Sequence, residues 1–295
     1  MKKIIFIFVA IVVFPCLGLE TYLTMENDTF LKKQDNDYTH GTKFETVTSK
    51  GYHFMGSQTM YAPSDLRRKE HIVGDRPYCG MLLGGVGYEF FYDPKFKWTH
   101  YGEIDFGIIG PGAMCKETQT MIHKLLNCKK PEGWNNQLHN EFVVNAQWWT
   151  KYNWYIQDWL VLVPRVGTAV GTIQDFVEIG CDLKFGYNIR PTVANGIIFS
   201  GTRGFDWKKK LTLYGYVGVD ERYYLYNHIL EGSLFNNKDK DLKVDIEPFV
   251  TEFKFGIVLK YEDFYITYYG IFRTDEFKHQ KNAPEYGGIC VGWSF

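Results

Sequence analysis

The chain has 295 residues and is nearly neutral, with 33 Lys and Arg against 34 Asp and Glu, and 18% of its residues are aromatic. This composition excludes a disordered chain, which would combine low hydrophobicity with high net charge. The charge balance also argues against a nucleic-acid-binding protein, because such proteins present a basic face to phosphates. The length suits one large domain or two small ones, and single all-β domains of this size are common.

The first eighteen residues predict a secretory signal peptide. A cationic start at residues 2–3 precedes an almost unbroken apolar run at residues 4–17, and Cys16 and Gly18 are small residues before a cut ahead of Leu19. This is the order of regions in an export signal. A membrane-anchoring helix is the alternative, but the run is shorter than the roughly 20 residues that a span requires.

Cysteine usage after the signal predicts at least one free thiol. An odd number in an exported protein leaves one cysteine unpaired or bonded to another molecule, and the number is too small for a disulfide scaffold. Cys115 and Cys128 flank one short segment, so they are the pair that could form a bridge. The five cysteines are Cys79, Cys115, Cys128, Cys181 and Cys290.

Alternating apolar residues recur along the rest of the chain, for example at every second position of 211–219 and 253–259. Such segments, separated by turn residues, predict β-strands with two different faces. No later run is long and apolar enough for a transmembrane helix. We expect roughly twelve strands from candidates at residues 20–27, 39–48, 55–61, 79–92, 101–106, 140–152, 158–171, 175–188, 196–206, 211–219, 253–260, 264–268 and 285–295.

Aromatic residues decide between a soluble sandwich and a membrane barrel. Trp and Tyr cluster at expected strand ends, as at residues 148–149 and 154–155, which is typical of the girdles of outer-membrane barrels. The last strand alternates up to a terminal Phe295, which resembles the signal that the bacterial barrel-assembly machinery recognises. The sequence therefore predicts an all-β fold, a transmembrane antiparallel β-barrel over residues 19–295 in the bacterial outer membrane.

One segment departs from the strand pattern. Residues 113–126 follow Gly-Pro-Gly and predict a short helix in an extracellular loop. Gln119 and His123 are four residues apart, so they lie on one face of this helix. The helical signal is an apolar stripe near the 3.6-residue period, which comprises Met114, Thr118, Met121, Ile122, Leu125 and Leu126.

A second polar cluster is expected at one rim of the barrel. Asn27 and Asp28 end the first strand and Thr39 lies near the start of the second, so a hairpin would bring the three together. Taken alone, Asn and Asp at a strand end are more often turn formers. A lone helical histidine, such as His123, is likewise more often a surface or hydrogen-bonded residue. Spacing alone therefore assigns neither cluster a function.

Eight short motifs follow one another along nearly the whole chain after residue 18. They are Glu-Asn-Asp at 26–28, Asp-Tyr-Thr-His-Gly at 37–41, Met-Tyr-Ala-Pro at 60–63, Gly-Asp-Arg-Pro-Tyr at 74–78, Ile-Ile-Gly-Pro at 108–111, Gln-Thr-Met-Ile-His at 119–123, Trp-Asn-Asn-Gln at 134–137 and Arg-Thr-Asp-Glu-Phe at 273–277. Together they resemble the outer-membrane lipid A 3′-O-deacylase family. The resemblance implies a twelve-stranded barrel and a Ca²⁺-dependent hydrolase that removes the 3′-linked acyloxyacyl group from lipid A in the outer leaflet, with its active site near the extracellular rim.

The resemblance also implies roles for five residues. His123 would be the base that takes a proton from water, since histidine titrates near neutral pH. Gln119 would orient His123 or the water, and Thr39 would hydrogen-bond the ester. Asp28 and Asn27 would hold Ca²⁺, which takes hard oxygen ligands and opposes the charge of an oxyanion. Two protein oxygens do not complete a calcium shell, so carbonyls, water or substrate must add to it.

The chain departs from the family pattern at three positions. Val73 stands where a lysine precedes Gly-Asp-Arg, so Lys69 or Arg76 could be the cation for the lipid phosphates; Arg76 suits an ion pair inside the barrel equally well. Lys129 stands where an acidic residue contributes after the helix, and His40 stands where Asn follows Tyr-Thr. These departures affect phosphate recognition more than hydrolysis.

Two other functions stay open. Another lipid-hydrolysing barrel, such as a phospholipase, would show a serine beside the base, but the matched motifs contain none in such a place. A non-enzymatic porin or adhesin would leave Asn27, Asp28, Gln119 and His123 scattered in space. Direct attack by water activated by His123 therefore fits the motifs better than an acyl-enzyme.

Overall fold

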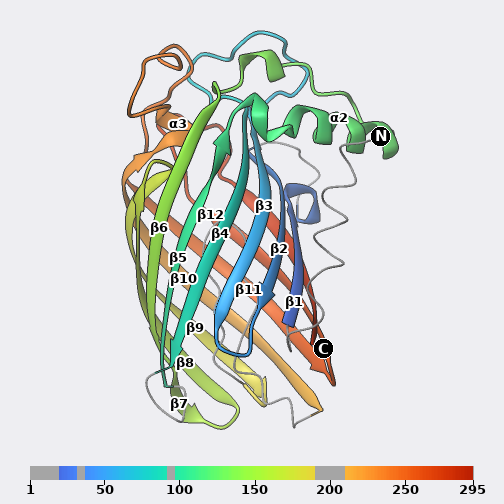
Figure 1. Cartoon of the computed structure of the whole chain (residues 1–295), viewed down its shortest axis with the longest axis vertical. Helices are drawn as coiled ribbons and strands as arrows, with labels where there is room; N and C mark the ends of the chain where they lie inside the picture. The colour runs from blue at the N-terminus through green and yellow to red at the C-terminus, as the bar shows by residue number, and fades with distance from the viewer. Residues whose placement is uncertain (1–19, 32–36, 92–96, 190–209, 295) are drawn as a thin grey trace.

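A computed structural model of the chain describes residues 20–31, 37–91, 97–189 and 210–294, and these form a closed antiparallel β-barrel (Figure 1). Twelve strands make the wall in chain order, and β1 pairs with β13 to close it. A short β7 (Trp154–Gln157) follows β6 and pairs antiparallel with the start of β8. The twelve are β1 (Glu20–Asn27), β2 (Asp37–Val47), β3 (Tyr52–Ala62), β4 (Cys79–Phe91), β5 (Trp98–Ile109), β6 (Glu141–Tyr152), β8 (Leu160–Gly171), β9 (Gln174–Tyr187), β10 (Leu211–Asn227), β11 (Phe249–Tyr261), β12 (Phe264–Arg273) and β13 (Glu285–Ser294).

Alternation along each strand separates an outer apolar face from an inner polar one. In β10, Leu211, Leu213 and Val217 are exposed, whereas Thr212 and Tyr214 between them are buried. Successive side chains of a strand point to opposite faces, so the exposed apolar set is the face that lipid covers. The predicted all-β barrel of about twelve strands is confirmed. The predicted signal peptide at 1–18, the candidate strand at 196–206 and Phe295 lie outside the described residues.

The two ends of the barrel differ in their connections. The turns at the lower end in Figure 1 are short where they are described, as at residues 48–51 and 262–263, and β13 ends there. The upper end carries η2 (Asp28–Phe30), η3 (Pro111–Ala113), α2 (Cys115–Leu125), η4 (Trp134–Asn136) and α3 (His228–Glu231). Outer-membrane barrels have short periplasmic turns and longer extracellular loops, so the upper end is the expected extracellular side. Among the described residues, no helix is long and apolar enough to cross a membrane.

The barrel interior is filled by paired charges. Arg165 of β8 contacts Glu178 at 3.2 Å and Asp182 at 2.7 Å, and also pairs with Asp220. The same network continues around the wall through Arg222–Glu178, Lys254–Asp220, Arg222–Glu252, Arg273–Glu252, Arg273–Glu276, Arg76–Glu276 and Arg76–Asp37. Side chains therefore occupy this part of the lumen, which is packed rather than open.

Candidate active site

A row of residues crosses four neighbouring strands on the outer face of the wall, at the upper rim. Strand register pairs Asn27 with His40, His40 with Met60, and Met60 with Gly80. Exposed apolar residues precede or follow this row on the same face, among them Met25. The row therefore lies on the side of the wall that faces lipid, at the upper edge of the apolar belt.

The helix α2 begins on this outer face rather than inside the barrel. Gly80 makes the approach possible, because a Cβ added there would lie 2.6 Å from Cβ of Cys115. The Gln58 amide donates to the Ala113 carbonyl at 2.6 Å, and Sγ of Cys115 lies 3.4 Å from the Thr59 carbonyl oxygen. These contacts fix the start of α2 against β3 and β4.

The buried side of α2 carries Cys115, Gln119 and His123, which are spaced four residues apart along one face. The prediction that Gln119 and His123 share a face is confirmed. The apolar stripe of the sequence lies on another side of the helix, where Met121 and Leu125 are exposed. The helix itself is shorter than predicted, since residues 111–113 form the separate turn η3 and α2 covers Cys115–Leu125. At its start, Ala113 and Cys115 pack in one apolar cluster with Met60, Tyr78 and Trp134.

His123 is held by a backbone group. Its Nδ1 lies 2.5 Å from the carbonyl oxygen of Lys129, and because a carbonyl only accepts, Nδ1–H is the donor. The neutral ring then carries its lone pair on Nε2, the nitrogen that a general base uses. The family's acidic residue after the helix is Lys129 here, yet the contact needs only its main chain. The sequence holds no signal for this role, because any residue supplies a carbonyl.

Gln119 is oriented by an aromatic residue from the following loop. Trp134 donates its indole N–H to Oε1 of Gln119 at 2.7 Å and packs on Tyr78 with ring centroids 4.7 Å apart. This directs the amide nitrogen away from Trp134, and that nitrogen is buried with no hydrogen-bond partner among the described residues. Such an unsatisfied buried donor requires an explanation, and an absent ligand is one. The Trp-Asn-Asn-Gln motif pointed to Trp134, but its spacing gave no role.

Asn27, Asp28 and Thr39 meet at the rim, as the predicted hairpin requires. Asn27 donates to the Thr39 carbonyl at 2.7 Å, and its amide oxygen accepts from the Thr29 N–H at 2.8 Å, which caps η2. Phe30 packs on Gly287 of β13, so η2 folds over the outer wall, and Asp28 at its start is buried. The hydroxyl of Thr39 is buried without a hydrogen-bond partner among the described residues.

The length of α2 is enough to bring His123 near the β1–β2 rim. From Cys115 to His123 a helix rises about 12 Å, which equals two to three strand spacings of about 4.8 Å. Figure 1 shows α2 extending past the upper ends of β3 and β2 toward that of β1. A helix that starts over Gly80 of β4 thus carries His123 toward the β1–β2 rim, where Asn27, Asp28 and Thr39 lie.

The cysteine at the start of α2 is neither bridged nor reactive. Cys115 is buried against the wall and Cys128 is exposed beyond the helix, so the bridge considered from the sequence is absent. An eleven-residue helix is about 16 Å long, whereas a disulfide needs Cα atoms within about 7 Å. Burial raises the pKa of the Cys115 thiol to about 12. The thiol therefore stays protonated and does not serve as a nucleophile.

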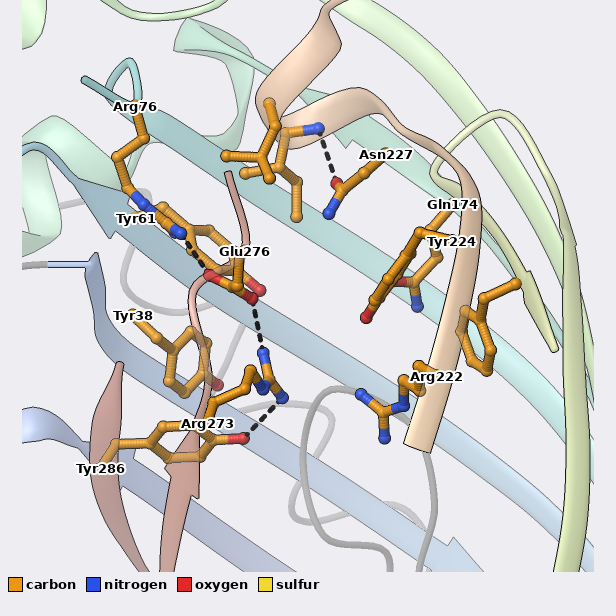
Figure 2. A pocket seen from close by; sticks show the side chains of 13 residues that line it. Tyr38, Tyr61, Arg76, Gln174, Arg222, Tyr224, Asn227, Arg273, Glu276 and Tyr286 are labelled. Carbon is orange, nitrogen blue, oxygen red and sulfur yellow. Dashed lines mark hydrogen bonds and ion pairs between the residues drawn. The ribbon is translucent and has the colours of Figure 1, made fainter. Parts of the chain in front are cut away.

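Arg76 and Lys69, the two cations considered for phosphate recognition, differ in their exposure. Arg76 is buried inside the barrel, where it pairs with Asp37 at 3.1 Å and with Glu276. Figure 2 shows Glu276 between Arg76 and Arg273. Arg76 is therefore a structural residue, as the ion-pair alternative predicted. Lys69 is exposed in the loop after β3, 3.7 Å from Glu132, and is the one of the two that a lipid phosphate could reach.

A cavity also lies within the barrel, lined by Tyr38, Tyr61, Arg222, Tyr224 and Tyr286 together with the Arg76–Glu276–Arg273 group (Figure 2). Its volume is about 20 Å³, which is room for about one water molecule. A lipid ester does not fit there. The polar groups beneath α2 are therefore the better candidate for chemistry on a lipid.

Comparison with known proteins agrees with this geometry. The sequence profile of the family described as outer membrane protein LpxR matches residues 6–295. Among solved structures, LpxR from Salmonella typhimurium is similar with a TM-score of 0.81 and 20% sequence identity, over 94% of this chain and 100% of that one. The β domain of the Bordetella autotransporter BrkA gives a TM-score of 0.47 at 9% identity, over 94% and 99% of the two chains. No curated protein matches the sequence.

The profile covers nearly the whole chain, and the Salmonella structure shares its barrel. An outer-membrane location follows from this match together with the apolar outer face of the barrel. The chain belongs to the family of outer membrane protein LpxR, which is the lipid A deacylase family that its motifs resemble.

Proposed function

We propose that this protein is a lipid A 3′-O-deacylase that hydrolyses the ester of the 3′-linked acyloxyacyl group with Ca²⁺ as cofactor. The observation that carries the proposal is the position of the polar stripe of α2. Gln119 and His123 are buried against the lipid-facing side of the wall, and the unsatisfied donor of Gln119 lies with them. A lipid ester in the outer leaflet approaches from this side, whereas the lumen is closed to it by paired charges.

The reaction consumes one water molecule. Nε2 of His123 takes a proton from that water as its oxygen attacks the ester carbonyl carbon, and the proton then passes to the 3′ oxygen as its bond to carbon breaks. The products are the deacylated sugar alcohol and the free fatty acid. The amide nitrogen of Gln119 and the hydroxyl of Thr39 are donors for the carbonyl oxygen as its charge develops. The contact between Nδ1 and the Lys129 carbonyl keeps the histidine in the required tautomer.

Oxygen donors at the β1–β2 rim fit Ca²⁺. Asp28 offers a buried carboxylate at this rim. Asn27 caps η2 with its amide oxygen, so in this arrangement its side chain organises the turn around Asp28. Among the described residues, no three His, Cys, Asp or Glu side chains form a metal cluster, so carbonyls, water or the substrate would complete the shell. Bound there, Ca²⁺ would supply positive charge for an oxyanion.

Export and assembly complete the proposal. The cationic and apolar segment at residues 1–18 would direct secretion, and the alternating C-terminal strand would be recognised by the barrel-assembly machinery. Lipopolysaccharide is the substrate, and the other outer-membrane lipids surround the wall. The site would act at the extracellular rim.

Mass spectrometry of lipid A from cells that express the protein tests this function. Wild type should remove one acyloxyacyl group, and a chelator of Ca²⁺ should prevent it. His123→Ala should lower the rate about 10²- to 10⁴-fold, the usual contribution of a general base. His139→Ala is the matched control, because His139 lies at the same end of the barrel but pairs with Asp239 at 2.7 Å. Unchanged lipid A with folded, surface-located wild type would exclude the function for this substrate.

A further inference from the structure

The exposed side of α2 is apolar although the helix lies outside the barrel. Met121 is 50% exposed, Leu125 is 76% exposed and Leu126, just after the helix, is 69% exposed. Large apolar side chains gathered on one exposed face indicate a contact with a protein or a membrane. The wall-facing stripe of Cys115, Gln119 and His123 already accounts for the packing of the helix, so this second face requires a different partner.

The helix has three distinct faces at 100° per residue. Cys115, Gln119 and His123 face the wall. About 100° further round lie Lys116, Thr120 and Lys124, and on the remaining side lie Met114, Thr118, Met121 and Leu125. A helix that lies flat at a membrane surface beside a barrel needs this division: one side toward the wall, one toward water and one toward acyl chains.

The apolar side of α2 continues the lipid-facing belt of the barrel. Leu82 follows Gly80 by two residues on the outer face and is exposed, and strand register places Ile108 opposite Leu82 and Phe142 opposite Ile108. Two residues along a strand are about 7 Å. The belt thus reaches to within one outward-facing position of the place where α2 contacts the wall.

Charge around the helix fits a membrane surface as well. Lys124 lies on the polar face, and Lys129 and Lys130 follow the helix, all of them exposed. Cations on the polar side of an interfacial helix lie at the level of anionic headgroups. A second protein subunit would leave these lysines and the neighbouring belt without a common partner, whereas lipid covers both.

We propose that α2 lies in the interfacial region of the outer leaflet, with Met121 and Leu125 among the acyl chains and Lys124 at the headgroups. The apolar face of α2 then contacts the hydrocarbon chains of the surrounding lipids. The consequence for catalysis rests on the proposed function: His123 and Gln119 are then held at the depth where ester bonds join sugar to acyl chain. The substrate need not leave the bilayer to reach them.

Spin labelling of the full chain in phosphatidylethanolamine–phosphatidylglycerol vesicles tests the position of the helix. Among the described cysteines, Cys128→Ser and Cys181→Ser remove the accessible thiols, while Cys79, Cys115 and Cys290 are buried, and Cys16→Ser removes the remaining thiol of the sequence. A nitroxide is then attached at Leu125→Cys or, in the matched control, at Lys124→Cys. We expect the label at 125 to collide mainly with oxygen and the label at 124 mainly with a water-soluble nickel chelate. Equal nickel accessibility at both positions, or exclusion of nickel from both, would overturn the proposal.

A second variant tests whether the position of α2 in the membrane affects lipid A hydrolysis. Leu125→Glu adds charge to the apolar face without touching the wall-facing stripe. We expect at least a tenfold loss of lipid A hydrolysis in vesicles and little change in detergent micelles, where the substrate is already extracted. Equal loss in both, or loss in neither, would contradict the catalytic consequence. Because the spin-label result does not depend on turnover, a wild type that leaves lipid A intact would refute the proposed function alone.

Discussion

Polar residues gather in two regions of this barrel, the lumen and the outer side of the wall near α2, and the two regions differ in how these residues are paired. In the lumen, each arginine is surrounded by carboxylates, as Arg165 is by Glu178 and Asp182. Outside the wall, the amide nitrogen of Gln119 on α2 is buried without a hydrogen-bond partner among the described residues, and at the β1–β2 rim so is the hydroxyl of Thr39. Single lumen atoms, such as Oε1 of Gln147, also lack such a partner, but the arginines of the lumen are paired with carboxylates.

The difference teaches where a barrel can hold chemistry. Buried charges destabilise a fold unless they are paired, so a lumen rich in Arg and Glu indicates structure before function. An unsatisfied donor beside a histidine, on the face that lipid covers, indicates a ligand. Charge density alone would favour the lumen, which is on the opposite side of the wall from the proposed site.

Breaking the lumen network should have the largest effect on stability. Arg165→Met leaves Glu178, Asp182 and Asp220 facing one another with one cation fewer, so we expect the free energy of unfolding to fall by about 3–5 kcal/mol. Activity per folded molecule should not change, because Arg165 lies within the barrel and away from α2. Urea titration followed by the heat-modifiable mobility of the folded barrel measures the first, and lipid A analysis of the folded fraction measures the second.

Arg67→Met is the matched control for that prediction. Arg67 pairs with Asp65 at 3.4 Å, but both side chains are largely exposed, and such surface pairs contribute little. It should unfold at the same urea concentration as wild type. A stable Arg165→Met variant with impaired activity would reverse the comparison, since it would make the lumen part of the active site.

Moving α2 should harm activity more than stability. Gly80→Ala introduces a Cβ 2.6 Å from Cβ of Cys115, so the helix or the strand must shift. Displacement of a catalytic group by about 1 Å can cost up to 10²-fold, so we expect a ten- to hundredfold lower rate of deacylation in a folded barrel. Gly56→Ala, whose nearest neighbour is the Leu83 carbonyl at 4.0 Å, should behave as wild type. Full activity of Gly80→Ala would show that the contact between α2 and the wall at Gly80 does not position His123.

The sequence predicted the fold well because its signal is local. Alternation at residues such as Leu211 and Leu213 follows directly from a strand that faces lipid on one side. Closure of β1 on β13 is expected once the strands are assigned to a membrane barrel, because such barrels are closed. The site was only partly predictable. Gln119 and His123 share a helical face by spacing alone, but the partner of that face, the wall around Gly80, depends on distant strands. The apolar stripe of α2 was visible in the sequence, but periodicity does not distinguish a stripe that faces a core from one that faces lipid.

The smallest expected effect comes from removing a single hydroxyl, either at the rim or in the lumen. Thr39→Val keeps the shape of the side chain and removes a buried hydroxyl that has no hydrogen-bond partner among the described residues, so stability should stay the same or rise. If that hydroxyl serves the ester, deacylation should slow about three- to tenfold, the value of one hydrogen bond of about 0.5–1.5 kcal/mol. Thr212→Val is the counterpart in the lumen, where the Asn188 amide donates to Thr212 at 2.8 Å, and it should lower stability by about 1–3 kcal/mol with activity unchanged. Thr39→Val that loses stability and keeps its rate would mean that the rim hydroxyl, like the lumen residues, belongs to the fold and not to the reaction.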